Sequence, residues 1–316
     1  MGMIVALGFV FGAIVGSFLN VVVWRVPRGM SLVRPPSTCP RCGHRIRPWE
    51  NIPILSWLFL RGRCSQCHQP ISWKYPAGEV AVGALYGLVA LRVWKEGLPL
   101  TTLIPWFWFA GAMLSLARID WEQRILPNLV TYSGMIFALL CALVFPFSRP
   151  ALINPANPHY GAILSRGLTE FLKGLPLPPG VSARLAALAD CLLGMGLGFL
   201  LLAVVYFAGK KMLQALARRR GDKGSNLPQE PLGWGDVKML AMTGAFLGAD
   251  AVVILLAGGT VLGSLVGLLV AAFPRKEKQE SLGWIQLPFA PFFAVPALLW
   301  VAAGNWFYWA MLPFLP

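Results

Sequence analysis

The sequence predicts an all-α polytopic membrane protein, with about eight transmembrane helices and one small cytoplasmic zinc-knuckle loop domain. Three observations support this fold class. The 316 residues are 57% hydrophobic and only 13% charged, whereas soluble domains contain about 25% charged residues. Apolar runs close to the roughly 20 residues needed to cross a bilayer recur along the chain. The net charge of +14 is concentrated between these runs, as in cytoplasmic loops under the positive-inside rule.

The positive charge raises the question of nucleic-acid binding. The Lys and Arg residues, however, gather in the segments between apolar runs. No recognised nucleic-acid-binding module accompanies them. We therefore expect no nucleic-acid partner, and we expect the charge to serve membrane topology and contact with anionic lipid.

The first transmembrane helix is predicted within residues 1–23. Glycines recur in it at every fourth position, which lets two helices approach closely. They are Gly8, Gly12 and Gly16. No positive charge precedes the run, and Arg25 and Arg28 follow it. A secretory signal has the opposite polarity, so the sequence predicts a retained helix whose N-terminus lies outside.

The remaining apolar runs predict the other crossings. They cover about 77–94, 103–119, 128–147, 188–208, 237–248, 251–273 and 287–303. The stretch from 237 to 273 exceeds one crossing and is divided at the "LGAD" of 247–250. An outside start then places the basic segments inside, and these are 24–76, 119–127, 209–236 and 274–286. Segment 148–187 is rich in Pro and Gly and is expected to be a long outer loop.

The first inner loop, residues 24–76, contains two Cys-x-x-Cys pairs. The four residues are Cys39, Cys42, Cys64 and Cys67. Two such knuckles are typical of a tetrahedral thiolate zinc site with a structural role. Free cysteines or a redox pair are the alternatives, and His44 or His68 beside the knuckles could replace one thiolate. Thiols on the inner side stay reduced, so disulfides are not expected.

Two carboxylates are predicted to meet at the inner face. Asp120 ends an inward-running helix, and Asp236 begins an outward-running one. Facing carboxylates can share a proton, hold a water and attack an amide carbonyl. Because the helix dipole favours an anion only at a helix N-terminus, Asp236 is expected to be ionised and Asp120 protonated. In the alternative reading, Asp236 only caps its helix and Asp120 pairs with Arg118 or Arg124.

Two glycines flank the second carboxylate, in the sequence "GWGD". Gly233 and Gly235 are expected to permit an unusual turn and a close backbone approach beside Asp236. Such an arrangement suits an extended substrate.

Taken together, these motifs resemble the prepilin peptidase family, the type IV leader peptidases with a GxGD aspartate motif. The matching stretches, in order, are "GSFLNVVVWRVPR" (16–28), "CPRCG", "CSQCH", "YPAGEVAVGALY" (75–86, with Glu79), "IDWEQRILPN", "GWGDVKMLAM" (with Lys238) and "LPFAPFFA" (287–294). A lone GxGD is weak evidence, whereas this ordered set spans nearly the whole chain and is specific.

The resemblance implies an aspartic endopeptidase of the bacterial inner membrane. It would remove the basic leader from type IV prepilins or pseudopilins at the cytoplasmic face, next to the leader's final Gly. Asp120 and Asp236 would be the catalytic pair, within a transmembrane peptidase core at 77–316. The family's outer loop is usually shorter than 148–187, which we interpret as an insertion or a partner contact.

Many members of the family also methylate the new N-terminus with S-adenosylmethionine. In those members the activity is associated with the cysteine loop, so the four cysteines would be ligands of a structural Zn²⁺. The residues that bind the methyl donor stay unassigned. Glu79, Gly233, Gly235 and Lys238 carry over as supporting residues, and Glu79 would either orient the substrate or pair with a Lys or Arg. Membrane lipid and a second copy of the chain are further expected partners.

Two other functions compete with this reading. A transporter or channel could use Asp120 and Asp236 as proton or ion ligands, but both lie at one face without a relay across the membrane. A zinc-bearing assembly scaffold would need no catalytic residues, and the two aspartate motifs argue against it. Incubation with a prepilin, with and without the Asp236→Asn change, separates the three.

Overall fold

A computed structural model describes residues 1–148, 166–220, 232–272 and 288–304. In this part of the chain the regular elements are helices, accompanied by two isolated β-bridges. The main helices are α1 (Gly2–Arg25), α3 (Lys74–Lys95), α4 (Leu103–Gln123), α5 (Asn128–Val144), α8 (Pro179–Arg220), α9 (Trp234–Leu247), α10 (Ala249–Ala272) and α11 (Ala290–Ala303). The all-α prediction is confirmed.

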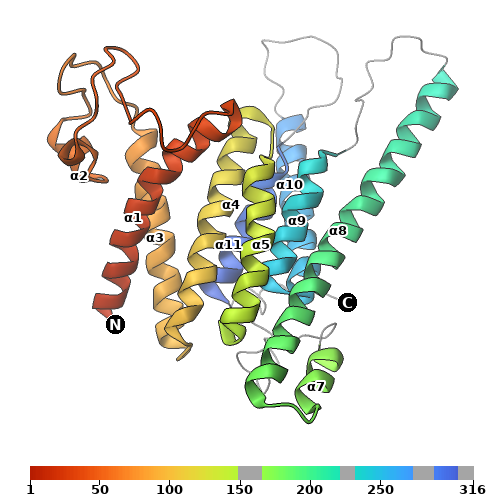
Figure 1. Ribbon diagram of the computed structural model, residues 1–316. Coiled ribbons are helices and arrows are strands. Elements are labelled where there is room, and N and C mark those ends of the chain that lie inside the picture. Colours follow the sequence, from red (N-terminus) through yellow and green to blue (C-terminus); the bar gives the residue numbers. More distant parts are fainter. Residues whose placement is uncertain (149–165, 221–231, 273–287, 305–316) are drawn as a thin grey trace.

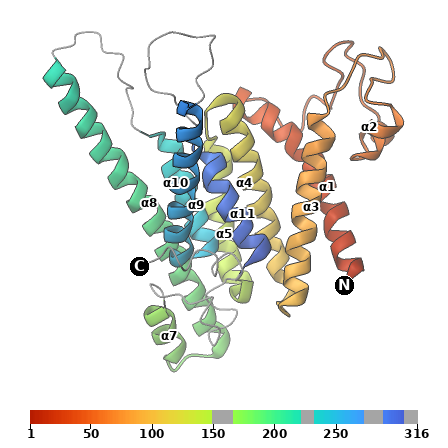
Figure 2. The same cartoon turned by 180° about the vertical axis from the view of Figure 1, so that it is seen from behind.

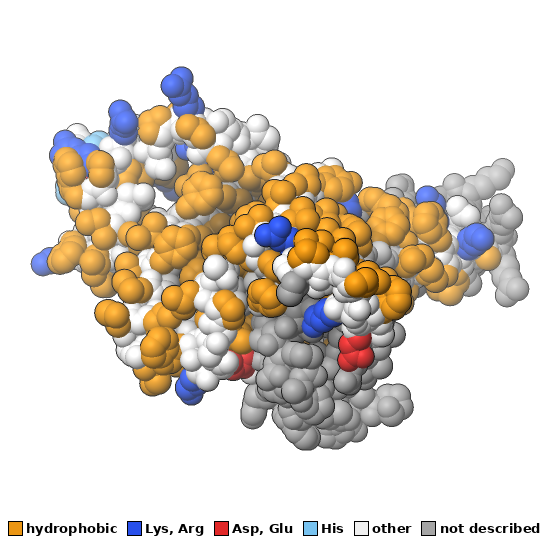
Figure 3. Space-filling model, turned by 60° about the horizontal axis from the view of Figure 1, so that its bottom comes forward, with side chains coloured by type: hydrophobic (Ala, Val, Ile, Leu, Met, Phe, Trp, Pro, Cys, Tyr) orange, Lys and Arg blue, Asp and Glu red, His pale blue; other side chains and the backbone are white. Residues whose placement is uncertain are grey.

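The length and apolar composition of several helices support a membrane location for this bundle. Five stretches in the described residues are long and apolar enough to cross a bilayer. They are Gly2–Arg28, Lys74–Lys95, Leu100–Gln123, Gly180–Ala215 and Ala249–Val270. Helices α5 and α11 are apolar but shorter, so the expected number of crossings remains a prediction. Hydrophobic side chains also cover much of the surface in Figure 3, as a lipid-facing surface requires.

The helices form a row of neighbours (Figures 1 and 2). Helix α1 packs on α3, and α3 contacts α4. Helices α4, α5, α9, α10 and α11 form the centre, where the main hydrophobic core lies. Helix α8 packs on α9 at the opposite side and leans away from the bundle toward its C-terminal end.

The glycine face of α1 makes the close contact that its spacing predicts. A Cβ added at Gly12 would lie 2.7 Å from the carbonyl oxygen of Val82, and one at Gly16 would lie 2.9 Å from Cα of Glu79. Because these distances leave no room for a side chain, α1 and α3 touch backbone to backbone. The predicted close approach of two helices is therefore confirmed.

The segment 148–187, expected to be a loop, contains helices in its described part. Helix α7 covers Arg166–Gly174, and α8 already begins at Pro179. The Pro and Gly residues in this region separate short helix-forming stretches, and a proline is well tolerated in the first turn of a helix. Residues 149–165 lie outside the described residues, as do 221–231 and 273–287 of the expected inner loops.

Helix α8 is also longer than the apolar run at 188–208 predicted. Its 42 residues correspond to about 63 Å, roughly twice the thickness of the hydrocarbon core. The predicted division between the next two crossings is confirmed, because α9 ends before Gly248, whose φ of +87° suits glycine.

Candidate active site and metal centre

The two aspartates of the sequence motifs come together at one end of the bundle. Asp120 lies in the last turn of α4, and Asp236 lies in the first turn of α9. Helix α4 contacts α9, and each side chain is only 6% exposed. The two carboxyl groups are close enough to act on each other electrostatically. Two buried acids side by side are costly unless a function maintains them.

Each carboxylate has a different set of neighbours. Oδ2 of Asp120 accepts a hydrogen bond of 2.9 Å from the backbone N–H of Ala290. Ala290 is the first residue of α11, where backbone N–H groups have no partner within the helix. Oδ1 of Asp236 is buried and has no hydrogen-bond partner among the described residues. One acid is therefore oriented by the protein, and the other has an oxygen to offer to a water or a substrate.

These neighbours bear on the charge assignment expected from the sequence, which stays a prediction. The N-terminal amide of α11 favours the anion on Asp120, and the positive charge of Arg124 acts in the same direction. Asp236 has no donor at Oδ1 among the described residues, and a neutral Asp236 beside an ionised Asp120 would avoid two adjacent negative charges. The expectation rests on the ends of α4 and α9, whereas the N-terminus of α11 also contacts Asp120.

The two glycines of the second motif provide space rather than an unusual turn. Gly233 precedes α9 with φ −69° and ψ 133°, which any residue can adopt. A Cβ there would lie 3.1 Å from Oδ2 of Asp236. Gly235 lies inside α9, and its Cβ would lie 2.7 Å from Cβ of Leu126 in the α4–α5 loop. The close approach is as expected, but the unusual turn is not observed.

In the part of the chain that the structure describes, Asp120 forms no ion pair with Arg118 or Arg124, although the charge of Arg124 acts on it. Among the described residues Arg118 forms an ion pair with Glu122 at 3.2 Å and donates a hydrogen bond of 2.5 Å to Oδ1 of Asn20. Asn20 in turn donates to the backbone oxygen of Tyr75 at 3.2 Å. This polar chain joins α1, α3 and α4. Sequence reasoning did not single out Asn20, although an amide within an apolar run could have indicated it.

The two remaining supporting residues each connect two elements of the fold. Oε2 of Glu79 is buried and accepts a hydrogen bond of 2.7 Å from the backbone N–H of Ile54. Glu79 has no ion-pair partner in the described chain, so the expected pairing with Lys or Arg is absent there. Lys238 donates to the side chain of Asn128, which ties α9 to α5.

The four cysteines form one cluster. Their sulfur atoms all lie within 4.8 Å of one another, and the Sγ atoms of Cys39 and Cys67 are 3.9 Å apart. A tetrahedron with Zn–S bonds of about 2.3 Å has edges of about 3.8 Å, so the spacing fits a closed four-thiolate metal site. All four thiols are free. His44 instead contacts Glu50 at 3.2 Å, so it does not replace a thiolate.

The two knuckles have the same pattern of backbone hydrogen bonds. In each, the backbone N–H of the first cysteine donates a hydrogen bond to the backbone oxygen of the residue five positions later. These bonds run from Cys39 to His44 and from Cys64 to Gln69. Backbone N–H groups, chiefly that of Cys42, lower the pKa of Cys39 to about 7. The pKa of Cys64 is lowered in the same way, chiefly by the N–H of Cys67. A lowered pKa favours the thiolate form that binds metal, whereas, despite a hydrogen bond from the backbone of His44, burial and the neighbouring thiols raise the pKa of Cys42 to about 11.

Comparison with known proteins gives a consistent family assignment. Residues 10–93 match the Bacterial Peptidase A24 N-terminal domain, and residues 107–268 match the Type IV leader peptidase family. A prepilin leader peptidase/N-methyltransferase of Pseudomonas putida is 31% identical, over 96% of this chain and 92% of that protein. One of Stutzerimonas stutzeri is 32% identical, over 92% of this chain and 89% of its own.

A relative with the same name from Myxococcus xanthus is 34% identical over 86% of this chain and 66% of its own length. No solved structure matches the chain. The second family match contains both motif aspartates, Asp120 and Asp236, and the first contains all four clustered cysteines. The chain therefore belongs to the type IV leader peptidase family.

Proposed function

We propose that Asp120 and Asp236 form the catalytic pair of a membrane endopeptidase that removes the leader of type IV prepilins or pseudopilins. The observation that carries this proposal is the buried, unpartnered Oδ1 of Asp236 beside a second buried carboxylate. Family membership supports peptidase activity over a transporter or a scaffold. It also supports a multi-pass protein of the bacterial inner membrane.

The neighbours of each acid suggest which carboxyl group acts as the base and which acts as the acid. Asp120, held as the anion by the amide of Ala290, accepts a proton from a water, whose oxygen attacks the peptide carbonyl carbon. Asp236, as the neutral acid, donates its proton to the carbonyl oxygen. When the tetrahedral intermediate collapses, the leaving nitrogen takes the proton from Asp120 and the carbonyl oxygen returns its proton to Asp236.

The same end of the bundle is proposed to face the cytoplasm. The loop domain with its arginines and the C-terminal end of α4 lie at this end (Figure 1). Positive charge accumulates on the cytoplasmic side, so the N-terminus of α1 at the other end would lie outside. A prepilin would then meet the carboxylates where its basic leader leaves the inner leaflet.

We also propose a structural Zn²⁺ in the four-cysteine cluster and S-adenosylmethionine as a second substrate. Zn²⁺ would lock the two knuckles into one fold, because it closes a shell of four thiolates. The hydrogen bond from Ile54 to Glu79 would then fix the folded loop domain to α3, next to the new N-terminus. The names of the relatives support N-methylation. The residues that bind the methyl donor stay unassigned.

Mass spectrometry of the products tests both activities in one tube. The purified protein is incubated with a prepilin peptide and S-adenosylmethionine. The account predicts loss of the leader, followed by the gain of one methyl group on the new N-terminus. Asp236→Asn should abolish the first product. An intact prepilin after incubation with the folded wild-type protein would contradict the proposed function.

A further inference from the structure

Two neighbouring cavities lie beside α1, the smaller between α1 and the loop domain and the larger within the loop domain. One has a volume of about 350 Å³ and the other about 520 Å³, sizes typical of small-molecule sites. Pro36, Ser37 and Asn51 line both cavities, so they adjoin each other. None of these residues belongs to the proposed peptidase or metal site.

The smaller cavity has an apolar wall on α1. Ile14, Phe18 and Val21 form this wall, and Val33 faces them from the loop segment. Ile14 and Phe18 are about half exposed, at 54% and 51%, so the wall is open to the bilayer. From Ile14 to Arg25 the helix extends about 16 Å, which is close to half of the roughly 30 Å hydrocarbon thickness. The apolar wall is therefore about as long as one leaflet of the hydrocarbon core is thick.

A buried cation closes the inner end of this wall. Arg25 is only 8% exposed, and its Nη1 donates a hydrogen bond of 2.9 Å to the backbone oxygen of Ser31. Among the described residues no carboxylate forms an ion pair with it. A buried charge without a counterion is costly, and the part of the chain that the structure describes supplies none for Arg25.

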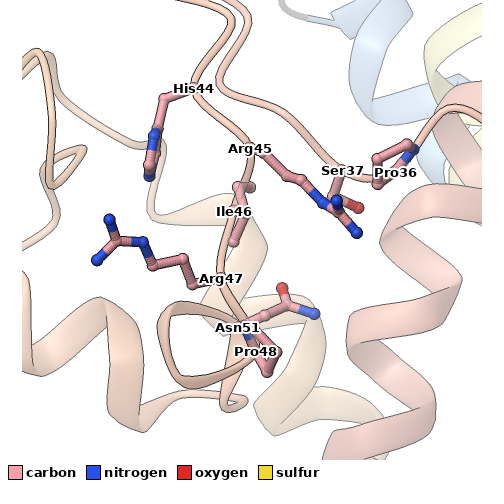
Figure 4. Close-up of a pocket in the computed structure, with 8 residues that line it drawn as sticks. All are labelled: Pro36, Ser37, His44, Arg45, Ile46, Arg47, Pro48 and Asn51. Carbon is pink, nitrogen blue, oxygen red and sulfur yellow. The ribbon is translucent and has the colours of Figure 1, made fainter.

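The adjoining cavity adds further positive charge. Arg45, Arg47 and His44 line it, and no acidic residue is among the residues that line either cavity. Figure 4 shows Arg45 extending toward Ser37, the residue shared with the smaller cavity, whereas Arg47 points to the opposite side. Arg25 and Arg45 are therefore the two cations suited to a ligand that occupies the apolar wall.

We propose that this groove binds an anionic glycerophospholipid of the inner leaflet. One acyl chain would lie along Ile14, Phe18 and Val21, and the headgroup phosphate would contact Arg25, with Arg45 as a second cation. The positive charges of Arg25 and Arg45 complement the negative headgroup, and the length of the apolar wall is close to that of an acyl chain. A basic prepilin leader has the wrong charge for this site. The lipid would hold the loop domain against α1 beside the active site.

Native mass spectrometry of the full-length protein tests the proposal with phosphatidylglycerol and phosphatidylcholine. The account predicts retained phosphatidylglycerol and about fivefold weaker binding for each of Arg25→Gln and Arg45→Gln. Arg28→Gln is the matched control, because Arg28 carries the same charge at the same helix end but stacks on Trp24 and lines neither cavity. It should bind within twofold of the wild type.

Three outcomes would overturn the proposal. Equal retention of phosphatidylcholine would show that charge is not recognised. An equal loss in Arg28→Gln would reduce the effect to diffuse surface charge. Displacement of the lipid by inorganic phosphate would mean that the groove recognises an anion and not a lipid. Arg45 is exposed, so Arg45→Gln gives a decisive result even where Arg25→Gln disturbs folding.

Discussion

The contact between Gly235 and Leu126 connects packing to catalysis most directly. Gly235 lies one residue before Asp236, and Leu126 lies in the loop that follows Asp120 on α4. A Cβ at position 235 would lie 2.7 Å from Cβ of Leu126, whereas ordinary contacts begin at 3.4 Å. Gly235→Ala therefore has to separate the two segments by about 0.7 Å.

That displacement acts on the distance between the two carboxylates. A misplacement of about 1 Å at a catalytic group costs on the order of a hundredfold in rate. We expect Gly235→Ala to cleave a prepilin peptide about ten- to a hundredfold more slowly, measured by the initial rate of leader release. The double variant with Leu126→Gly removes the opposing Cβ and should recover most of the rate.

Gly196→Ala provides the matched control. Gly196 lies in α8, and a Cβ there would meet nothing within 4 Å, so its rate should equal that of the wild type. A wild-type rate in Gly235→Ala, or no recovery in the double variant, would refute the idea that this contact sets the geometry of the pair.

Three further variants test other parts of the structure. Cys64→Ser removes one of four clustered thiols and should lose the bound zinc by metal analysis; a full complement of zinc would contradict the four-cysteine site. Gly12→Val introduces a side chain 2.7 Å from the backbone of Val82 and should lower the free energy of unfolding by about 1–3 kcal/mol, whereas an unchanged unfolding transition would argue against the close packing. Glu79→Ala leaves the N–H of Ile54 without its acceptor, which costs about 1–3 kcal/mol and should speed proteolysis of the loop domain. Glu79→Gln keeps an acceptor oxygen and should resist proteolysis as the wild type does.

Features encoded by regular spacing could be predicted from the sequence. The glycines of α1 recur at a helical interval, so their shared face and its close contact with another helix follow from helix geometry. The two aspartates end and begin apolar runs of opposite direction, and that alternation places them at the same face. The cysteine pairs carry the spacing of a metal site.

Features that depend on long-range contacts could not be predicted in this way. The amide that orients Asp120 belongs to Ala290, 170 positions away, and a backbone N–H has no residue type that would reveal it. The charge assignment expected from the two helix ends therefore leaves this contact out. The loop 148–187 was expected from its prolines and glycines, but proline at the start of α8 is compatible with a helix.

The central claim is that Asp120 and Asp236 act as one unit, and single-turnover cleavage by three variants tests it most directly. Asp120→Asn, Asp236→Asn and the double variant are compared with the wild type at saturating prepilin. The account predicts that each single change removes as much activity as both together, because residues that act as a unit are not additive. The account would be contradicted if the fold-loss of cleavage rate in the double variant equalled the product of the two single fold-losses. Substantial cleavage in either single variant would contradict it too.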